Sequence, residues 1–280
     1  MTTGTADTRT VPARRVRIAQ VLAWTLAVAA AVPFFGLIDL ATLPGWVNQE
    51  YIWEVPLEVS WGSLFTFFVA LPYVWIALAP GRALPGLALL AIAAVALALS
   101  AAAGLDPRPA VPAAVIGASV LGLGWLLGTR PTRGVPVSVS RPLAILAVAG
   151  AGLWLPYVLA AFEQSRAGVL GSITNGIEHW PVQGAAGAAV ALATGLAAVW
   201  PPARRLFRVA ISLSAALIGL SVAAYPERAG GTEGITWCTL AVLWGLAVAL
   251  IPSREAPGTQ ERRDAERRTG DEARAGSAAA

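Results

Sequence analysis

Eight long runs of apolar residues, separated by short polar segments, organise this chain. Each run has about 20 residues, the length that an α-helix needs to cross the hydrocarbon core of a bilayer. None shows the alternation typical of a barrel strand, so each is predicted to be a helix, which satisfies its own backbone hydrogen bonds in lipid. The sequence therefore predicts an all-α, polytopic membrane helix bundle with eight transmembrane helices. The predicted spans cover residues 20–40, 60–79, 84–103, 109–128, 142–162, 181–200, 206–225 and 234–252.

Scarce residues recur in the second half of the chain at nearly the spacing of the first half. At a spacing of 121 the pairs are Pro80 and Pro201, Ser100 and Ser221, Asp106 and Glu227, Pro131 and Pro252, and Arg133 and Arg254. At 125 they are Pro56 and Pro181, Glu58 and Gln183, and Gly62 and Gly187; Asp39 and Glu163 are 124 apart. Each half holds an even number of spans, which predicts a parallel duplication of a four-helix unit.

This repeat divides the chain into four predicted regions. They are a cytoplasmic N-terminal segment (1–19), a first four-helix half (20–133), a second half (134–253) and a charged tail (254–280). The tail has no apolar periodicity and cannot bury a core, so it is expected to be disordered. The alternative explanation of the repeat is that any polytopic protein places proline and arginine at the ends of its spans.

The basic residues predict the orientation. All 20 are arginine, and with the N-terminus in the cytoplasm only Arg108, Arg166 and Arg228 fall on the outer side. Positive charge gathers on the cytoplasmic side of membrane proteins. We therefore expect both termini to be cytoplasmic. The alanine-rich, lysine-free composition indicates a bacterium, so the expected location is a bacterial plasma membrane.

Two long outer connections, 41–59 and 163–180, occupy the same place in each half. In the first, Val47, Tyr51 and Val55 share one helical face, which predicts a short helix in the headgroup region. Pro56 is expected to begin the second span, where its missing N–H costs nothing.

Several kinds of chemistry have no support in the sequence. No charged residue lies near the middle of any predicted span, where pumps and ion-coupled carriers keep ionisable groups. No glycine-rich phosphate loop is present, and one cysteine and one histidine cannot form a thiolate or bis-imidazole site. We expect no cofactor, no metal and no nucleic-acid partner.

The candidate site residues lie on the predicted outer side, where most acidic residues gather. If the halves meet at a duplication axis, Asp39 should approach Glu163, and Glu58 should approach Gln183. Glu178 and His179 belong to a second polar patch in the later loop. Ligand binding by these residues is one interpretation, and a solvated acidic rim is the other. The residues concerned are Asp39, Glu58, Glu163, Glu178, His179 and Gln183.

Three functions remain open at this stage. The first is a non-enzymatic accessory or scaffold subunit, or the membrane component of a transport complex, in the lipid bilayer with a partner membrane or ATPase subunit. The alternative is a small-molecule or lipid facilitator with an outer-facing cleft between the two halves. The third is an outer-leaflet enzyme that uses Glu54, Glu58, Glu178 or His179 as acid or base.

Overall fold

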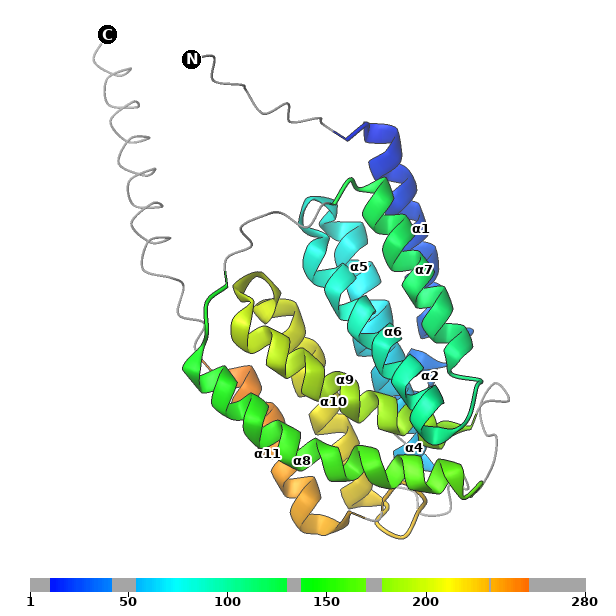
Figure 1. The fold of residues 1–280 in the computed structure, drawn as a ribbon, viewed down its shortest axis with the longest axis vertical. Helices are drawn as coiled ribbons and strands as arrows, with labels where there is room; N and C mark the ends of the chain where they lie inside the picture. Colours follow the sequence, from blue (N-terminus) through cyan, green and yellow to red (C-terminus); the bar gives the residue numbers. More distant parts are fainter. Residues whose placement is uncertain (1–10, 42–53, 130–136, 170–177, 232, 252–280) are drawn as a thin grey trace, which may run out of the picture. The chain divides into compact units, whose positions relative to one another are not determined.

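The computed structural model describes residues 11–41, 54–129, 137–169, 178–231 and 233–251. Their regular secondary structure is helical, and the helices belong to one compact unit (Figure 1). A π-helix, η1 (Leu64–Ala70), joins α4 to α5, and the 3-10 turns η2 (Pro80–Arg82) and η4 (Pro201–Ala203) precede α6 and α10. The helices are α1 (Ala13–Ala31), α2 (Gly36–Leu40), α4 (Val55–Ser63), α5 (Leu71–Leu78), α6 (Leu84–Gly104), α7 (Ala110–Leu126), α8 (Arg141–Arg166), α9 (His179–Val199), α10 (Arg204–Ala224) and α11 (Gly234–Leu250).

Helix length and hydropathy identify a multi-pass membrane protein. Within the described ranges, five helical stretches are long and apolar enough to cross a membrane. Two shorter apolar helices, α7 and α11, coincide with further predicted spans. The prediction of several membrane-crossing helices is confirmed, while the number eight stays a prediction. The five stretches are Val55–Leu78, Leu84–Gly104, Arg141–Arg166, His179–Val199 and Pro201–Ala224.

The first predicted span, 20–40, is wrong as one continuous helix. α1 ends and α2 begins within it, and Phe35 between them adopts the left-handed region with φ 61°. Pro33 explains the break, because its ring cannot donate a backbone hydrogen bond and clashes with the preceding turn. Gly36 then lets α2 lie close to η1, since a Cβ there would be 3.0 Å from the Cβ of Phe65.

The second span begins where Pro56 indicated and not at the boundary of the apolar run, residue 60. α4 begins at Val55 rather than near residue 60, and Pro56 lies in its first turn, as expected for a residue without an N–H. The helix continues through η1 into α5, where Pro72 lies in the first turn. Pro72 cannot continue the α-helical ladder, and the turns before it widen into the π-helix.

Glycines bring α9 close to α8. A Cβ at Gly184 would be 2.8 Å from Cδ1 of Phe162, and a Cβ at Gly187 would be 2.9 Å from Cδ1 of Tyr157. Small residues are the usual means of close packing between membrane helices. α9 also packs against α6 and α4, while α10 packs against α4 and α11. The α4–α5 stretch and α9 are the most buried of the candidate spans, and α8 is the least buried.

Some predictions lie outside the described residues. These are most of the two outer connections, at 42–53 and 170–177, and the tail from residue 252. The interfacial helices and the disordered tail therefore stay predictions.

Candidate functional site

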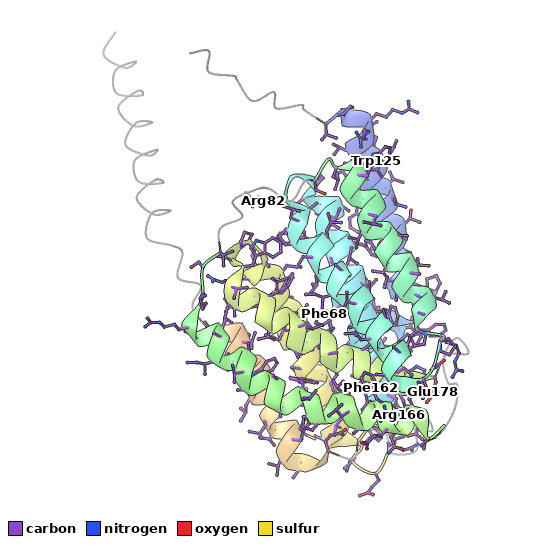
Figure 2. The ribbon with its side chains drawn as sticks, viewed as in Figure 1. Phe68, Arg82, Trp125, Phe162, Arg166 and Glu178 are labelled. Atoms are coloured by element: carbon purple, nitrogen blue, oxygen red, sulfur yellow. The ribbon has the colours of Figure 1, made fainter. Side chains whose placement is uncertain are left out.

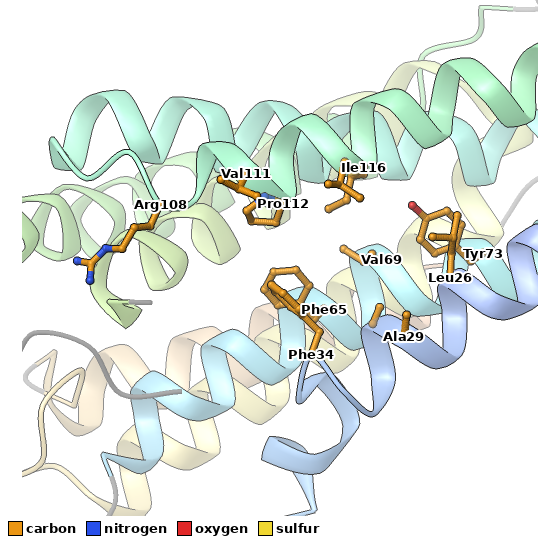
Figure 3. A pocket seen from close by; sticks show the side chains of 12 residues that line it. Leu26, Ala29, Phe34, Phe65, Val69, Tyr73, Arg108, Val111, Pro112 and Ile116 are labelled. Carbon is orange, nitrogen blue, oxygen red and sulfur yellow. The ribbon is translucent and has the colours of Figure 1, made fainter. Parts of the chain in front are cut away.

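A pocket of about 440 Å³ opens between α1 and α7 and reaches η1 and α5 (Figure 3). Arg108 lies at one end and Tyr73 at the other, and the rest of the lining is apolar. On its rim, Val111 and Val115 are 68% and 56% exposed, so the pocket opens on the side of the bundle. This size and lining are typical of small-molecule sites. The remaining lining residues are Leu26, Ala29, Ala30, Phe34, Phe65, Val69, Pro112 and Ile116.

Two further pockets differ from this one in their chemistry. One, of about 350 Å³, lies between α1, η1, α5 and α10, and the other, of about 630 Å³, lies between α6, α7 and α9. Neither is lined by a charged residue. The pocket between α1 and α7 is therefore distinguished by its charged end.

Arg108, the charged residue that lines this end, belongs to an ionic cluster with Asp106 and Glu178, which lie behind it and do not themselves line the pocket. Nε of Arg108 donates to Oδ1 of Asp106 at 2.8 Å, and its Nη2 donates to Oε2 of Glu178 at 3.2 Å. The backbone N–H of Arg108 also donates to Asp106 Oδ1, at 3.0 Å, which fixes the turn between α6 and α7. Glu178 lies at the end of the bundle opposite to Arg82 (Figure 2). The cluster joins this turn to the start of α9.

Burial and mutual charge set the electrostatics of this ionic cluster. Both carboxylate side chains are 6% exposed, whereas the Arg108 side chain is 40% exposed. Burial raises the pKa of Glu178, and the Asp106 carboxylate adds to that rise while Arg108 opposes it. The hydrogen bond to Asp106 raises the pKa of Arg108, so the guanidinium stays charged.

Two polar side chains of α9 are buried with no hydrogen-bond partner in the described part of the chain. His179 is 1% exposed and both ring nitrogens lack a partner; Gln183 is fully buried and both amide atoms lack one. The His179 ring lies 4.8 Å from the Trp61 ring. Because native proteins pair nearly all buried polar groups, this end of α9 is chemically unusual.

Asp39 and Glu58 lie together where α2 packs on α4. They are 4% and 3% exposed. Burial, with a further contribution from the Glu58 carboxylate, raises the pKa of Asp39 to about 8. Asp39 is therefore mostly protonated at neutral pH.

The structure brings only part of the predicted set together. Asp39 is buried beside Glu58, whereas Glu163 is exposed near the end of α8. Glu58 and Gln183 lie on α4 and α9, which pack together, but no hydrogen bond joins these two side chains. Glu178 instead belongs to the ionic cluster at the pocket.

Sequence reasoning missed Asp106, Arg108 and the pocket itself. A usable signal was present, because Arg108 is one of three arginines on the predicted outer side and lies two residues after Asp106. The pocket had no such signal, since its lining residues are ordinary apolar residues from helices distant in sequence.

The sequence matches no protein-family model, and no curated protein or solved structure matches it significantly. Function must therefore be inferred from the chemistry of the site.

Proposed function

We propose that this protein is a membrane facilitator that takes an amphipathic small molecule or lipid from the bilayer into the pocket between α1 and α7. The observation that carries this proposal is a side-opening apolar pocket with one ionic cluster at its end. An apolar tail would fill the space between α1, η1 and α7. A polar headgroup would lie at Asp106, Arg108 and Glu178.

This site differs in position from the cleft that the sequence predicted. The expected cleft lay between the two halves, but the pocket is lined only by residues of the predicted first half. Where the halves would meet, α4 packs directly against α9. The proposed ligand therefore enters beside one half rather than along a duplication axis.

Internal duplication is part of this proposal, and the packing of helices supports it. α6 packs against α9, and its counterpart α10 packs against α4, the counterpart of α9. Such reciprocal contacts are what a two-fold relation between the halves requires. Local detail agrees: the hydroxyl of Ser100 donates to the Leu97 carbonyl at 2.9 Å, and that of Ser221 donates to the Ile218 carbonyl at 2.8 Å.

If the halves are duplicated, large aromatic side chains of the second half would occupy the space that corresponds to the pocket. At the repeat spacings, Ala30 corresponds to Trp154, and Ile116 corresponds to Trp237. The rings of Trp154 and Trp237 lie 5.3 Å apart, and Trp237 stacks on Tyr157 at 4.9 Å. Protein interiors are normally filled in this way. Under the proposed duplication, the pocket would therefore be specific to the first half.

The test replaces Ala30 by tryptophan, the residue at the corresponding position, 154, of the predicted second half. Ala30→Trp places in the pocket the side chain that closes the corresponding space, so binding of a neutral amphiphile such as decanol should fall at least about tenfold. Ala29→Trp, on the exposed rim, should act in the same direction without entering the core. Binding is measured by titration of the protein reconstituted in lipid nanodiscs.

Ala114→Trp is the matched control, because Ala114 is exposed on α7 and does not line the pocket. It should leave decanol binding unchanged. Equal binding by the wild type and all three folded tryptophan variants would remove the proposed site.

The other functions stay as predictions. The accessory-subunit hypothesis, with a partner membrane or ATPase chain, is compatible with a bound lipid and is not favoured by a particular contact. The enzyme hypothesis has less support, because Glu178 is held by Arg108 and the His179 ring packs on Trp61. Location in a bacterial plasma membrane with both termini cytoplasmic also stays a prediction.

A further inference from the structure

We infer that the ligand of this pocket is an amphipathic organic cation, whose ammonium group binds at the carboxylates of Asp106 and Glu178. This inference rests on the proposed function, because the tail of the ligand must occupy the pocket between α1 and α7. The inference specifies the charge of the ligand's headgroup, which the apolar lining of the pocket does not determine.

The balance of charge at the polar end favours a cation. Two carboxylates, Asp106 and Glu178, share one guanidinium, so the ionised cluster carries a net negative charge. An anionic headgroup would meet this negative charge beside an apolar wall, where charges are weakly screened. An ammonium group would neutralise it.

Each carboxylate also has an oxygen that still needs a hydrogen-bond donor. Among the described residues, Asp106 Oδ2 and Glu178 Oε1 are buried and have no hydrogen-bond partner. The hydroxyl of Ser165 lies beside Glu178, where it opposes the rise in the pKa of Glu178, and it donates to the carbonyl of Gly104 at 3.0 Å. A buried acceptor without a donor is costly, and an ammonium group has three donors and no acceptor. The unmet requirement is therefore for donors.

The Arg108 guanidinium already binds the two carboxylates that a ligand ammonium group would bind. Its guanidinium points away from the pocket (Figure 3), towards Asp106 and Glu178, and its side chain is 40% exposed. Because both carboxylates are buried, loss of the guanidinium would be costly unless another cation replaced it. A ligand ammonium would then take its place at the two oxygens.

Aromatic rings in the middle of the pocket add to the preference (Figure 3). Phe34 and Phe65 line the pocket, with ring centroids 4.7 Å apart, and Trp61 stacks on Phe34 at 5.4 Å. The faces of aromatic rings attract organic cations, and more strongly where water is excluded.

The experiment compares three probes with the same alkyl chain: decylammonium, decanol and decanoate. Each is titrated into the full-length protein in nanodiscs of zwitterionic lipid, so that the bilayer itself has no net charge. We expect decylammonium to bind roughly tenfold more tightly than decanol, and decanoate to bind more weakly than decanol.

Variants of the ionic cluster separate a cation site from an anion site. Glu178→Gln should remove most of the ammonium preference and leave decanol binding unchanged. Arg108→Gln removes the competitor and should strengthen decylammonium binding several-fold, whereas an anion site would lose affinity. Glu163→Gln is the matched control, because Glu163 is an exposed carboxylate outside the pocket.

The outcomes distinguish this inference from the proposed function. If decanol binds and Ala30→Trp abolishes its binding, but decylammonium shows no preference or decanoate binds best, the cation inference is overturned and the pocket stands. If no probe responds to Ala30→Trp or Ala29→Trp, both proposals fail.

Discussion

At the residue scale, the buried acid Asp39 links the stability of the protein to pH. Its pKa is raised from an ordinary value of 3.8 to about 8, first by burial and then by the Glu58 carboxylate. Glu58 in turn lies near Glu54, so acidic groups surround this position. The folded chain therefore holds a proton on Asp39 that the unfolded chain releases at lower pH.

The proton on Asp39 determines the direction in which the stability of the protein changes with pH. Between about pH 4 and pH 8 the folded state binds more protons at Asp39 than the unfolded state, so stability falls as pH rises through this window. Asp39→Asn removes the titration. At pH 8 the variant should be more stable than the wild type by about 1 kcal/mol or more, a rise in melting temperature of about 2–4 °C.

The measurement is thermal unfolding across this pH range, with Glu163→Gln as an exposed control. The control should follow the wild-type curve. Parallel pH curves for the wild type and Asp39→Asn would show that Asp39 is not protonated in the folded protein.

At the element scale, the helices could be predicted from the sequence, but the positions where they break could be predicted only in part. Continuous apolar runs predicted helices at every span, because lipid leaves the backbone no alternative. The break at Pro33 was missed, since a proline within an apolar run is often tolerated in membrane helices, and the left-handed Phe35 has no sequence signature. The π-helix before Pro72 was likewise invisible to a pattern of hydrophobicity.

Close contact between elements depends on single glycines and can be tested one position at a time. Gly184→Ala places a Cβ against the Phe162 ring, which should destabilise the protein by about 1–3 kcal/mol. Gly195 is on the same helix, and a Cβ there meets no atom within 4 Å. Gly195→Ala should therefore be neutral or stabilise the helix by about 0.5–1 kcal/mol.

Thermal unfolding of the two variants in the same detergent separates these effects. If both substitutions change the melting temperature equally, the contact between α8 and α9 does not depend on Gly184.

At the scale of the whole molecule, the sequence predicted a membrane bundle but not where its pocket lies. The predicted duplication pointed to the meeting of the halves, and there α4 packs against α9, where His179 and Gln183 have no hydrogen-bond partner among the described residues. The pocket lies in the predicted first half, where Ala30 is small; Trp154, its counterpart under the proposed duplication, is large. Such a difference is visible in the sequence only after the halves have been aligned and the packing is known.

The site and the fold are connected through the ionic cluster. Asp106 and Arg108 belong to the turn between α6 and α7, and Glu178 precedes α9, so a ligand at this end would contact elements of both predicted halves. Binding there would stabilise the packing of α6 and α7 beside α9 by mass action.

The most direct test of the central claim is to map where an amphipathic cation binds. Decylamine with a photoreactive diazirine in its tail is crosslinked to the protein in nanodiscs, and the labelled peptides are sequenced by mass spectrometry. The account predicts labelling of Leu26, Val69 and Ile116, which excess decylammonium prevents. Labelling spread over exposed apolar positions such as Ile145 and Leu243, with no enrichment at the pocket and no competition, would contradict it.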